Sequence, residues 1–96
     1  MNINFGEVIY TNRRDRNLSQ RDLANILNID YKEVCRIENN RVDINLSCYD
    51  VIIEKLAEVF QLDIKWLEEI RSQTEKKSDL DLSDAIFPVY WKDVVK

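Results

Sequence analysis

Apolar side chains along this 96-residue chain recur three or four positions apart, and no stretch alternates between apolar and polar residues as a half-buried strand would. Five such stretches each follow a residue that favours the N-terminal cap of a helix. We therefore predict five helices and an all-α fold. The expected caps are Asn4, Ser19, Asp30, either Asn45 or Ser47, and Asp63. The first helix is expected to end near Arg16, the second at Asn28 and the third near Asn39.

The expected core positions lie on one face of each helix. The fourth helix has the most continuous apolar face, so we expect it at the centre of the core. In chain order the predicted core residues are Phe5, Val8 and Ile9; Leu23, Ala24, Ile26 and Leu27; Val34 and Ile37; Tyr49, Ile52, Ile53, Leu56, Val59 and Phe60; and Ile64, Trp66, Leu67 and Ile70.

Residues 1–71 are expected to form one domain, followed by a linker and an apolar C-terminal tail in residues 72–96. The linker, residues 72–84, is polar and charged, whereas the tail carries three aromatic side chains, Phe87, Tyr90 and Trp91. An exposed aromatic cluster usually marks an interface. The tail could pack on the fourth and fifth helices of its own chain, dock on a partner chain, or be disordered. We expect docking, on the same chain or a partner, over disorder.

The residue types present exclude several classes of enzyme. The chain has no histidine, and its two cysteines, Cys35 and Cys48, are not spaced as a C-x-x-C pair, so zinc sites and Ser-His-Asp chemistry lack their ligands or base. A single glycine, Gly6, leaves no glycine-rich loop for phosphates. We find no nucleophile paired with a base, and therefore expect no enzyme activity, no cofactor and no metal.

Two observations bear on the compartment. No apolar run approaches the roughly 20 residues of a transmembrane helix. The first residues, MNINF, lack the basic and then apolar pattern of a secretory signal. We expect a soluble cytoplasmic protein without a membrane partner, in which both cysteines are free thiols.

The net charge of −4 at first argues against nucleic acid, because Lys and Arg supply most of the non-specific affinity for phosphates. The distribution of charge weakens that objection. In residues 1–46 seven basic side chains balance seven acidic ones, whereas residues 47–96 carry seven basic and eleven acidic side chains. All the excess acid is therefore C-terminal.

The second and third predicted helices are short and are separated by a turn of about three residues, as in a helix-turn-helix motif. Residues 18–24 (LSQRDLA), 28–30 (NID) and 34–41 (VCRIENNR) resemble the lambda-repressor-like, xenobiotic-response-element family of bacterial and phage regulators. The resemblance covers about residues 5–70. It implies a five-helix DNA-binding domain whose third helix enters the major groove of an operator, in a homodimer that acts as a transcription regulator, most simply a repressor.

The resemblance also assigns roles to individual residues. Gln20 is placed at a phosphate and a base edge, while Tyr31, Lys32 and Arg36 face bases or adjacent phosphates. Arg36 matches the donor geometry that guanine O6 and N7 require, and Asn39, Asn40 and Arg41 match positions that hold the DNA backbone. The complete set of expected DNA-binding residues is Gln20, Arg21, Tyr31, Lys32, Glu33, Arg36, Asn39, Asn40 and Arg41. The same resemblance implies a structural salt bridge between Arg13 and Glu38.

Four features depart from the family pattern. Asn17, Asn28 and Asn40 stand where glycine is usual, and we expect left-handed backbone there because asparagine tolerates positive φ better than other non-glycine residues. The segment between Glu38 and Ala57 is about four residues longer than usual and lacks the family's proline. Either the fourth helix starts a turn early or the preceding loop is longer.

Two alternatives compete with the interpretation as a DNA-binding regulator. Lys32 and Arg36 on a helix that lacked the motif would be ordinary solvated charges paired with Glu33. The same fold could also serve as an antitoxin or adaptor, with the acidic C-terminal half and the aromatic tail binding a partner protein. The basic residues of the third helix favour DNA, and the acidic excess favours the protein partner.

Overall fold

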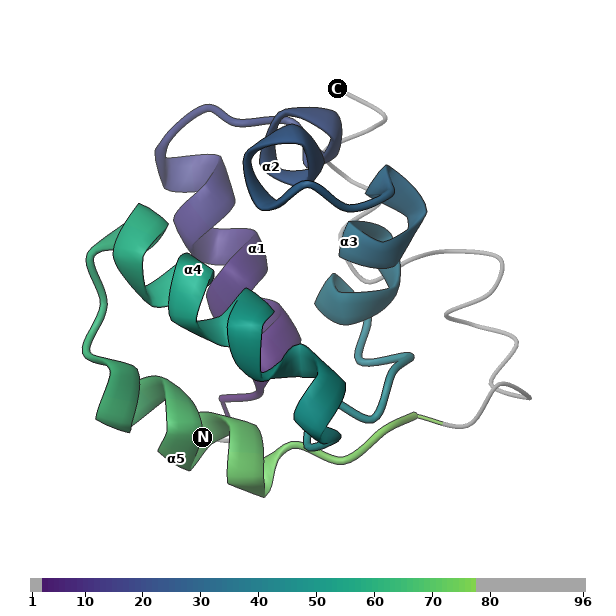
Figure 1. Ribbon diagram of the computed structural model, residues 1–96, viewed down its shortest axis with the longest axis vertical. Helices are drawn as coiled ribbons and strands as arrows, with labels where there is room; N and C mark the ends of the chain where they lie inside the picture. The colour runs from purple at the N-terminus through teal and green to yellow at the C-terminus, as the bar shows by residue number, and fades with distance from the viewer. Residues whose placement is uncertain (1–2, 78–96) are drawn as a thin grey trace.

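The computed structural model describes residues 3–77, which are all-helical and contain no strand (Figure 1). Phe87, Tyr90 and Trp91, on which we placed the predicted interface, lie outside the described residues. The elements are α1 (Phe5–Asp15), α2 (Gln20–Leu27), α3 (Tyr31–Glu38), a short 3-10 helix η1 (Ser47–Tyr49), α4 (Asp50–Phe60) and α5 (Ile64–Gln73). The prediction of five α-helices is confirmed. None of the described helices is long and apolar enough to cross a membrane.

Four of the five predicted helix starts are confirmed by side-chain caps. The Asn4 side chain accepts a hydrogen bond from the Glu7 amide at 2.9 Å, and Asp30 and Asp63 cap α3 and α5 in the same manner. Ser19 forms a reciprocal capping box with Asp22 at the start of α2. These caps satisfy amide groups that a helix leaves unpaired at its first turn, which is why each helix begins where it does.

The predicted cap of the fourth helix is wrong. Tyr49 occupies the cap position of α4, but its side chain makes no capping hydrogen bond to the helix, and η1 leads directly into α4. Asn45 does not cap this helix, because its side-chain amide donates to the Thr74 carbonyl at 3.3 Å. The extra residues between α3 and α4 therefore form a longer loop, residues 39–46, followed by η1.

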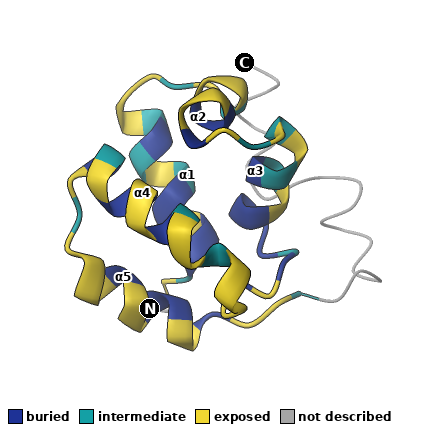
Figure 2. Ribbon diagram, viewed as in Figure 1, coloured by how far each residue is buried: buried dark blue, intermediate teal, exposed yellow. Residues whose placement is uncertain are grey.

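The core lies between α1, α4 and the α2–α3 pair, and α5 covers α4 (Figures 1 and 2). The fully buried side chains include Phe5, Leu23, Ile53, Leu56 and Phe60, in agreement with the predicted apolar faces and with α4 as the central helix.

Three predicted core residues, Ile26, Ile64 and Trp66, are exposed. Each lies at the edge of its helical stripe, where a short helix on the outside of the fold turns side chains toward solvent. Two loop residues that periodicity did not identify, Val42 and Ile44, are buried instead.

Arg71 holds the long loop against the rest of the fold. Its buried guanidinium donates to the carbonyls of Ile44 at 2.7 Å and Leu46 at 2.8 Å. It also forms ion pairs with Asp50 at 2.7 Å and with Glu68 at 3.0 Å. Burial acts to lower the pKa of Arg71, but the hydrogen bonds to the two carboxylates outweigh it and raise that pKa. The guanidinium thus replaces the loop's missing regular hydrogen bonds.

The fold extends beyond residue 71, the predicted end of the domain. Helix α5 continues to Gln73, and the buried Thr74 hydroxyl accepts a hydrogen bond from the Phe5 amide at 2.8 Å while donating to the Ile70 carbonyl at 2.8 Å. Residues 72–74 therefore belong to the folded domain, and the predicted linker cannot begin at residue 72. Their polar composition was misleading because Thr74 is buried with both its hydrogen-bonding functions satisfied.

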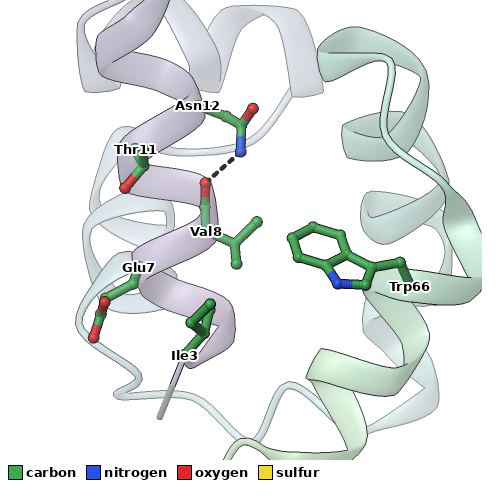
Figure 3. Close-up of a pocket in the computed structure, with 6 residues that line it drawn as sticks. All are labelled: Ile3, Glu7, Val8, Thr11, Asn12 and Trp66. Atoms are coloured by element: carbon green, nitrogen blue, oxygen red, sulfur yellow. Dashed lines mark hydrogen bonds between the residues drawn. The ribbon is translucent and has the colours of Figure 1, made fainter. Parts of the chain in front are cut away.

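A shallow apolar groove of about 300 Å³ lies between α1 and α5. Trp66 points from α5 toward Val8 of α1, and Ile3 closes one end beside the first turn of α1 (Figure 3). Trp66 and Ile3 are both exposed, which accounts for two of the large apolar side chains that the fold leaves in water.

Candidate nucleic-acid interface

Helices α2 and α3 pack against each other and are joined by a tight turn. Asn28 ends α2 in the left-handed conformation with φ 58° and ψ 47°, and the following amide, of Ile29, donates to the Ala24 carbonyl at 2.9 Å. Asn17 and Asn40 also have positive φ, 56° and 58°, so the prediction for all three asparagines is confirmed. Gln61 adopts the same conformation after α4, which the sequence analysis did not identify.

The first residues of α2 contact opposite ends of α3. Arg21 stacks over the ring of Tyr31, with its guanidinium carbon 4.0 Å from the ring centroid. The neighbouring Gln20 donates from its side-chain amide to Glu38 at 3.0 Å. Both expected DNA-binding residues of α2 are thus positioned by α3. This places their side chains on the surface that the two helices share.

The outward face of α3 carries the basic residues that the sequence analysis singled out. Lys32 and Arg36 are exposed, with 60% of the Arg36 side chain accessible. Tyr31 is half-buried, because its ring packs against the core and lies under Arg21. Guanidinium, ammonium and phenol groups presented along one helix face match the acceptors and methyl groups in a major groove.

A chain of polar contacts crosses this face. The Glu33 carboxylate pairs with Arg36 at 3.2 Å through Oε1 and accepts a hydrogen bond from the Tyr49 hydroxyl at 2.7 Å through Oε2. Burial and the Glu33 carboxylate together raise the pKa of Tyr49 to about 12, so the phenol remains a donor. Tyr49 is one of the predicted core residues, and the structure leaves it half-buried. The hydroxyl contact spans 16 positions, so no local pattern could have shown it.

The last residue of α3, Glu38, forms a buried ion pair with Arg13 of α1. Arg13 reaches Glu38 through Nε at 2.6 Å and Nη2 at 3.1 Å, and the Glu38 side chain is 0% exposed. A third nitrogen of Arg13 donates to the Leu18 carbonyl at 2.8 Å. This is the salt bridge that the family resemblance implied, and it fixes α1 and the start of α2 against α3.

Asn39 and Asn40, expected to contact the DNA backbone, are buried and point into the protein. The Asn39 side chain donates to the Cys35 carbonyl at 3.0 Å, and Asn40 Oδ1 accepts from the Gly6 amide at 3.0 Å. The Asn40 carbonyl accepts from the Lys77 amide at 2.7 Å. Because these groups already serve the fold, the two asparagines do not belong to the candidate interface, whereas the half-buried Arg41 remains a candidate.

Gly6 explains how α1 comes so close to the end of α3. A Cβ atom at this position would lie 2.2 Å from the Glu38 carbonyl oxygen and 2.8 Å from Asn40 Oδ1. Only glycine permits this approach, since the nearest obstacle is backbone. A single glycine inside a helix carries no signal of its packing partner, so this contact could not be predicted from the sequence.

The described residues hold no group of three or more His, Cys, Asp or Glu side chains that could bind a metal ion. Cys35 is half-buried and Cys48 exposed, and both are free thiols. No family model, no curated protein and no solved structure matches the chain.

Proposed function

We propose that this protein is a sequence-specific DNA-binding transcription regulator of the lambda-repressor-like type, acting as a repressor by occupying an operator. The observation that carries the proposal is the outward face of α3, where Lys32 and Arg36 are exposed on a short helix that follows a left-handed turn from α2. A helix of this length, held at a fixed angle by a second helix, fits the major groove.

The exposed groups divide into two roles. Arg36 would form a bidentate contact with guanine, and Tyr31 would pack on a thymine methyl group. Lys32, Arg21 and Arg41 would contact phosphates or, for Lys32, guanine. Gln20 donates one amide hydrogen to Glu38, and the second amide hydrogen would serve a phosphate. Base contacts would provide specificity, and phosphate contacts would fix the position of the domain.

We further propose that the protein binds its operator as a homodimer, because one α3 contacts only a half-site and dimers place two such helices about 34 Å apart. The oligomeric state is tested by mass in solution, for the full chain and for a chain ending at Lys77. That truncation preserves every contact of Thr74 described above. A loss of dimer on truncation would place the interface in the tail.

The proposal is tested by selecting binding sites from randomised duplex DNA and measuring affinity for the selected site and for random DNA over a range of salt concentrations. We expect a selected site bound at least a thousandfold more tightly than random sequence. Lys32→Ala should weaken binding. It should also reduce the slope of log affinity against log salt concentration by about 1, as expected for the loss of one phosphate contact. The matched control is Lys55→Ala, an exposed lysine of α4, which should change neither.

An interaction protein, either an antitoxin or an adaptor, is the second candidate. The observation that favours it is the acidic excess of residues 47–96, eleven acidic against seven basic side chains, which repels DNA and would suit a basic partner surface. A protein that selects no site and binds random DNA only weakly, even at low salt, would favour this candidate over the regulator.

A further inference from the structure

Glu33 is an acidic residue in the first turn of the helix that we propose enters the major groove, where the phosphates of DNA surround every side chain. Its side chain is 25% exposed, and its Oε1 pairs with the exposed Arg36 at 3.2 Å. An acid at such a position lies close to the negative phosphates, so a hydrogen-bond donor on a base, in addition to the ion pair with Arg36, would favour its binding. Cytosine N4 presents that donor in the major groove.

We infer that Glu33 is a specificity-determining residue that accepts a hydrogen bond from cytosine N4, within one base step of the guanine bound by Arg36, and that Tyr49 is its positioning residue. The inference rests on the DNA-binding function proposed above and names the sequence that the interface prefers. The operator half-site would therefore contain a cytosine next to the Arg36 guanine or paired with it.

The contacts of the carboxylate support this assignment. Tyr49 binds Oε2 and Arg36 binds Oε1, so both oxygens are fixed in direction in the free protein. Each carboxylate oxygen accepts more than one hydrogen bond, which leaves capacity for the cytosine amino group. A carboxylate held in this way loses little side-chain entropy when it meets a base.

Tyr49 comes from η1, which directly follows the long loop that Arg71 holds in place, and not from the helix-turn-helix itself. Its phenol is protonated at physiological pH, as that of an ordinary tyrosine is, and its hydroxyl donates to Glu33 at 2.7 Å. The extra residues between α3 and α4 thus supply a support for the recognition helix, in addition to connecting two elements.

The experiment is site selection from randomised DNA followed by affinity measurements on sites that differ at one base pair. We expect the wild-type protein to prefer cytosine at one position beside the Arg36 guanine by about tenfold, within the range of a single good side-chain contact. Glu33→Gln should change this preference to adenine, because glutamine pairs with adenine N6 and N7. Tyr49→Phe should reduce the preference for cytosine at least threefold, with little change in affinity for random DNA.

Two controls separate positioning from a general structural effect. Tyr10→Phe removes the hydroxyl of another half-buried tyrosine, on α1 beside Arg13, and should leave every base preference unchanged. Alkaline titration of tyrosine absorbance should show the phenol of highest pKa shifted downward in Glu33→Gln. If Tyr49→Phe does not fold, Glu33→Gln and this titration still test the contact.

Different results would contradict the proposed DNA binding, the role of Glu33 and the role of Tyr49. A wild-type protein that selects no site contradicts DNA recognition itself. A protein that selects a site without cytosine next to or opposite the Arg36 guanine, or whose preferences are the same in Glu33→Gln, overturns the role of Glu33. A Tyr49→Phe variant with unchanged cytosine preference, or with equal losses on all sequences, overturns the role of Tyr49.

Discussion

The two ends of α3 carry similar polar residues and have opposite environments. At the start of the helix Lys32 is exposed and Tyr31 is only half-buried, whereas at its end Glu38, Asn39 and Asn40 are buried. A polar side chain at the start meets solvent or, as we propose, DNA. A polar side chain at the end meets backbone amides, a guanidinium and the first turn of α1.

What packs against each end produces this difference. Gly6 brings α1 onto the end of α3, where the Gly6 amide donates to Asn40 and Arg13 reaches Glu38. At the start, Arg21 stacks on Tyr31, and Lys32 is exposed. Polar character alone therefore does not identify a binding residue, and the close approach of a second backbone decides which polar groups remain accessible.

The largest effect is expected at the buried end. Glu38→Ala leaves the Arg13 guanidinium buried without its carboxylate, and loss of one partner from such a pair costs about 3–5 kcal/mol of folding free energy. Chemical denaturation measures it. Glu54→Ala, which removes an exposed carboxylate from α4, should change stability by less than about 0.5 kcal/mol. Equal effects of the two changes would contradict a structural role for the buried pair.

The opposite pattern is expected on the exposed face. Arg36→Ala should weaken binding to the selected site by about 1–3 kcal/mol, because one bidentate base contact is lost, while the melting temperature stays within error of wild type. Affinity for random DNA should hardly change. Lys65→Ala, an exposed change on α5, is the control. An equal loss on cognate and random DNA would reassign Arg36 to a phosphate.

A smaller effect separates the two left-handed asparagines that flank α3. Both have φ 58°, so glycine suits the backbone at either position. Asn28 is exposed and Asn28→Gly should be nearly neutral, whereas Asn40→Gly removes the acceptor of the Gly6 amide and should cost about 1 kcal/mol. Thermal unfolding of both variants measures the difference in stability loss. Equal losses would show that water replaces Asn40 Oδ1 as the acceptor of the Gly6 amide.

The smallest effect concerns the capping box of α2. Hydrogen bonds from the Ser19 backbone and side chain lower the pKa of Asp22 below its ordinary value of 3.8. A carboxyl group with a depressed pKa in the folded state stabilises above the ordinary pKa, and this contribution is lost as the pH falls through the lower folded value.

The stability difference between wild type and Asp22→Ala should therefore be present at neutral pH and shrink toward zero on acidification below about pH 4. Thermal unfolding at several pH values checks it. In a Ser19→Ala background the pH-dependent effect of Asp22→Ala should largely persist, because the Ser19 backbone amide still donates to the Asp22 carboxylate. A difference that stays constant with pH would show that the Asp22 charge does not act through the cap.

Most of the fold could be predicted from the sequence, because helix caps and apolar helix faces depend on residues that are close in sequence. Ser19 with Asp22 started α2 as expected, and Asn17, Asn28 and Asn40 took the left-handed backbone that their chemistry tolerates. The predictions that failed depend on distant partners. Ile26 and Trp66 fit a helical stripe, yet within residues 3–77 both are exposed.

The same limit applies to the candidate interface. Lys32 and Arg36 could be assigned to the outer face from helical spacing alone. Asn39 and Asn40 could not be assigned to the interior, because their burial depends on Gly6, which lies 34 positions before Asn40. The contact between Tyr49 and Glu33 depends likewise on the path of a loop whose course is set by Arg71.

The hydrogen bond from the Phe5 amide to the Thr74 hydroxyl joins residues 69 positions apart, which is nearly the full length of the described domain. On a ribosome, the first helix would leave the exit tunnel long before its partner is synthesised. Until residue 74 is made, the first turn of α1 lacks this partner, and the nascent domain exposes apolar surface that α5 later covers. In a circular permutant of residues 3–77, a short peptide would join the two ends of the described domain and the chain would be opened elsewhere. Such a permutant should keep the native architecture while changing the order in which its parts become available to fold.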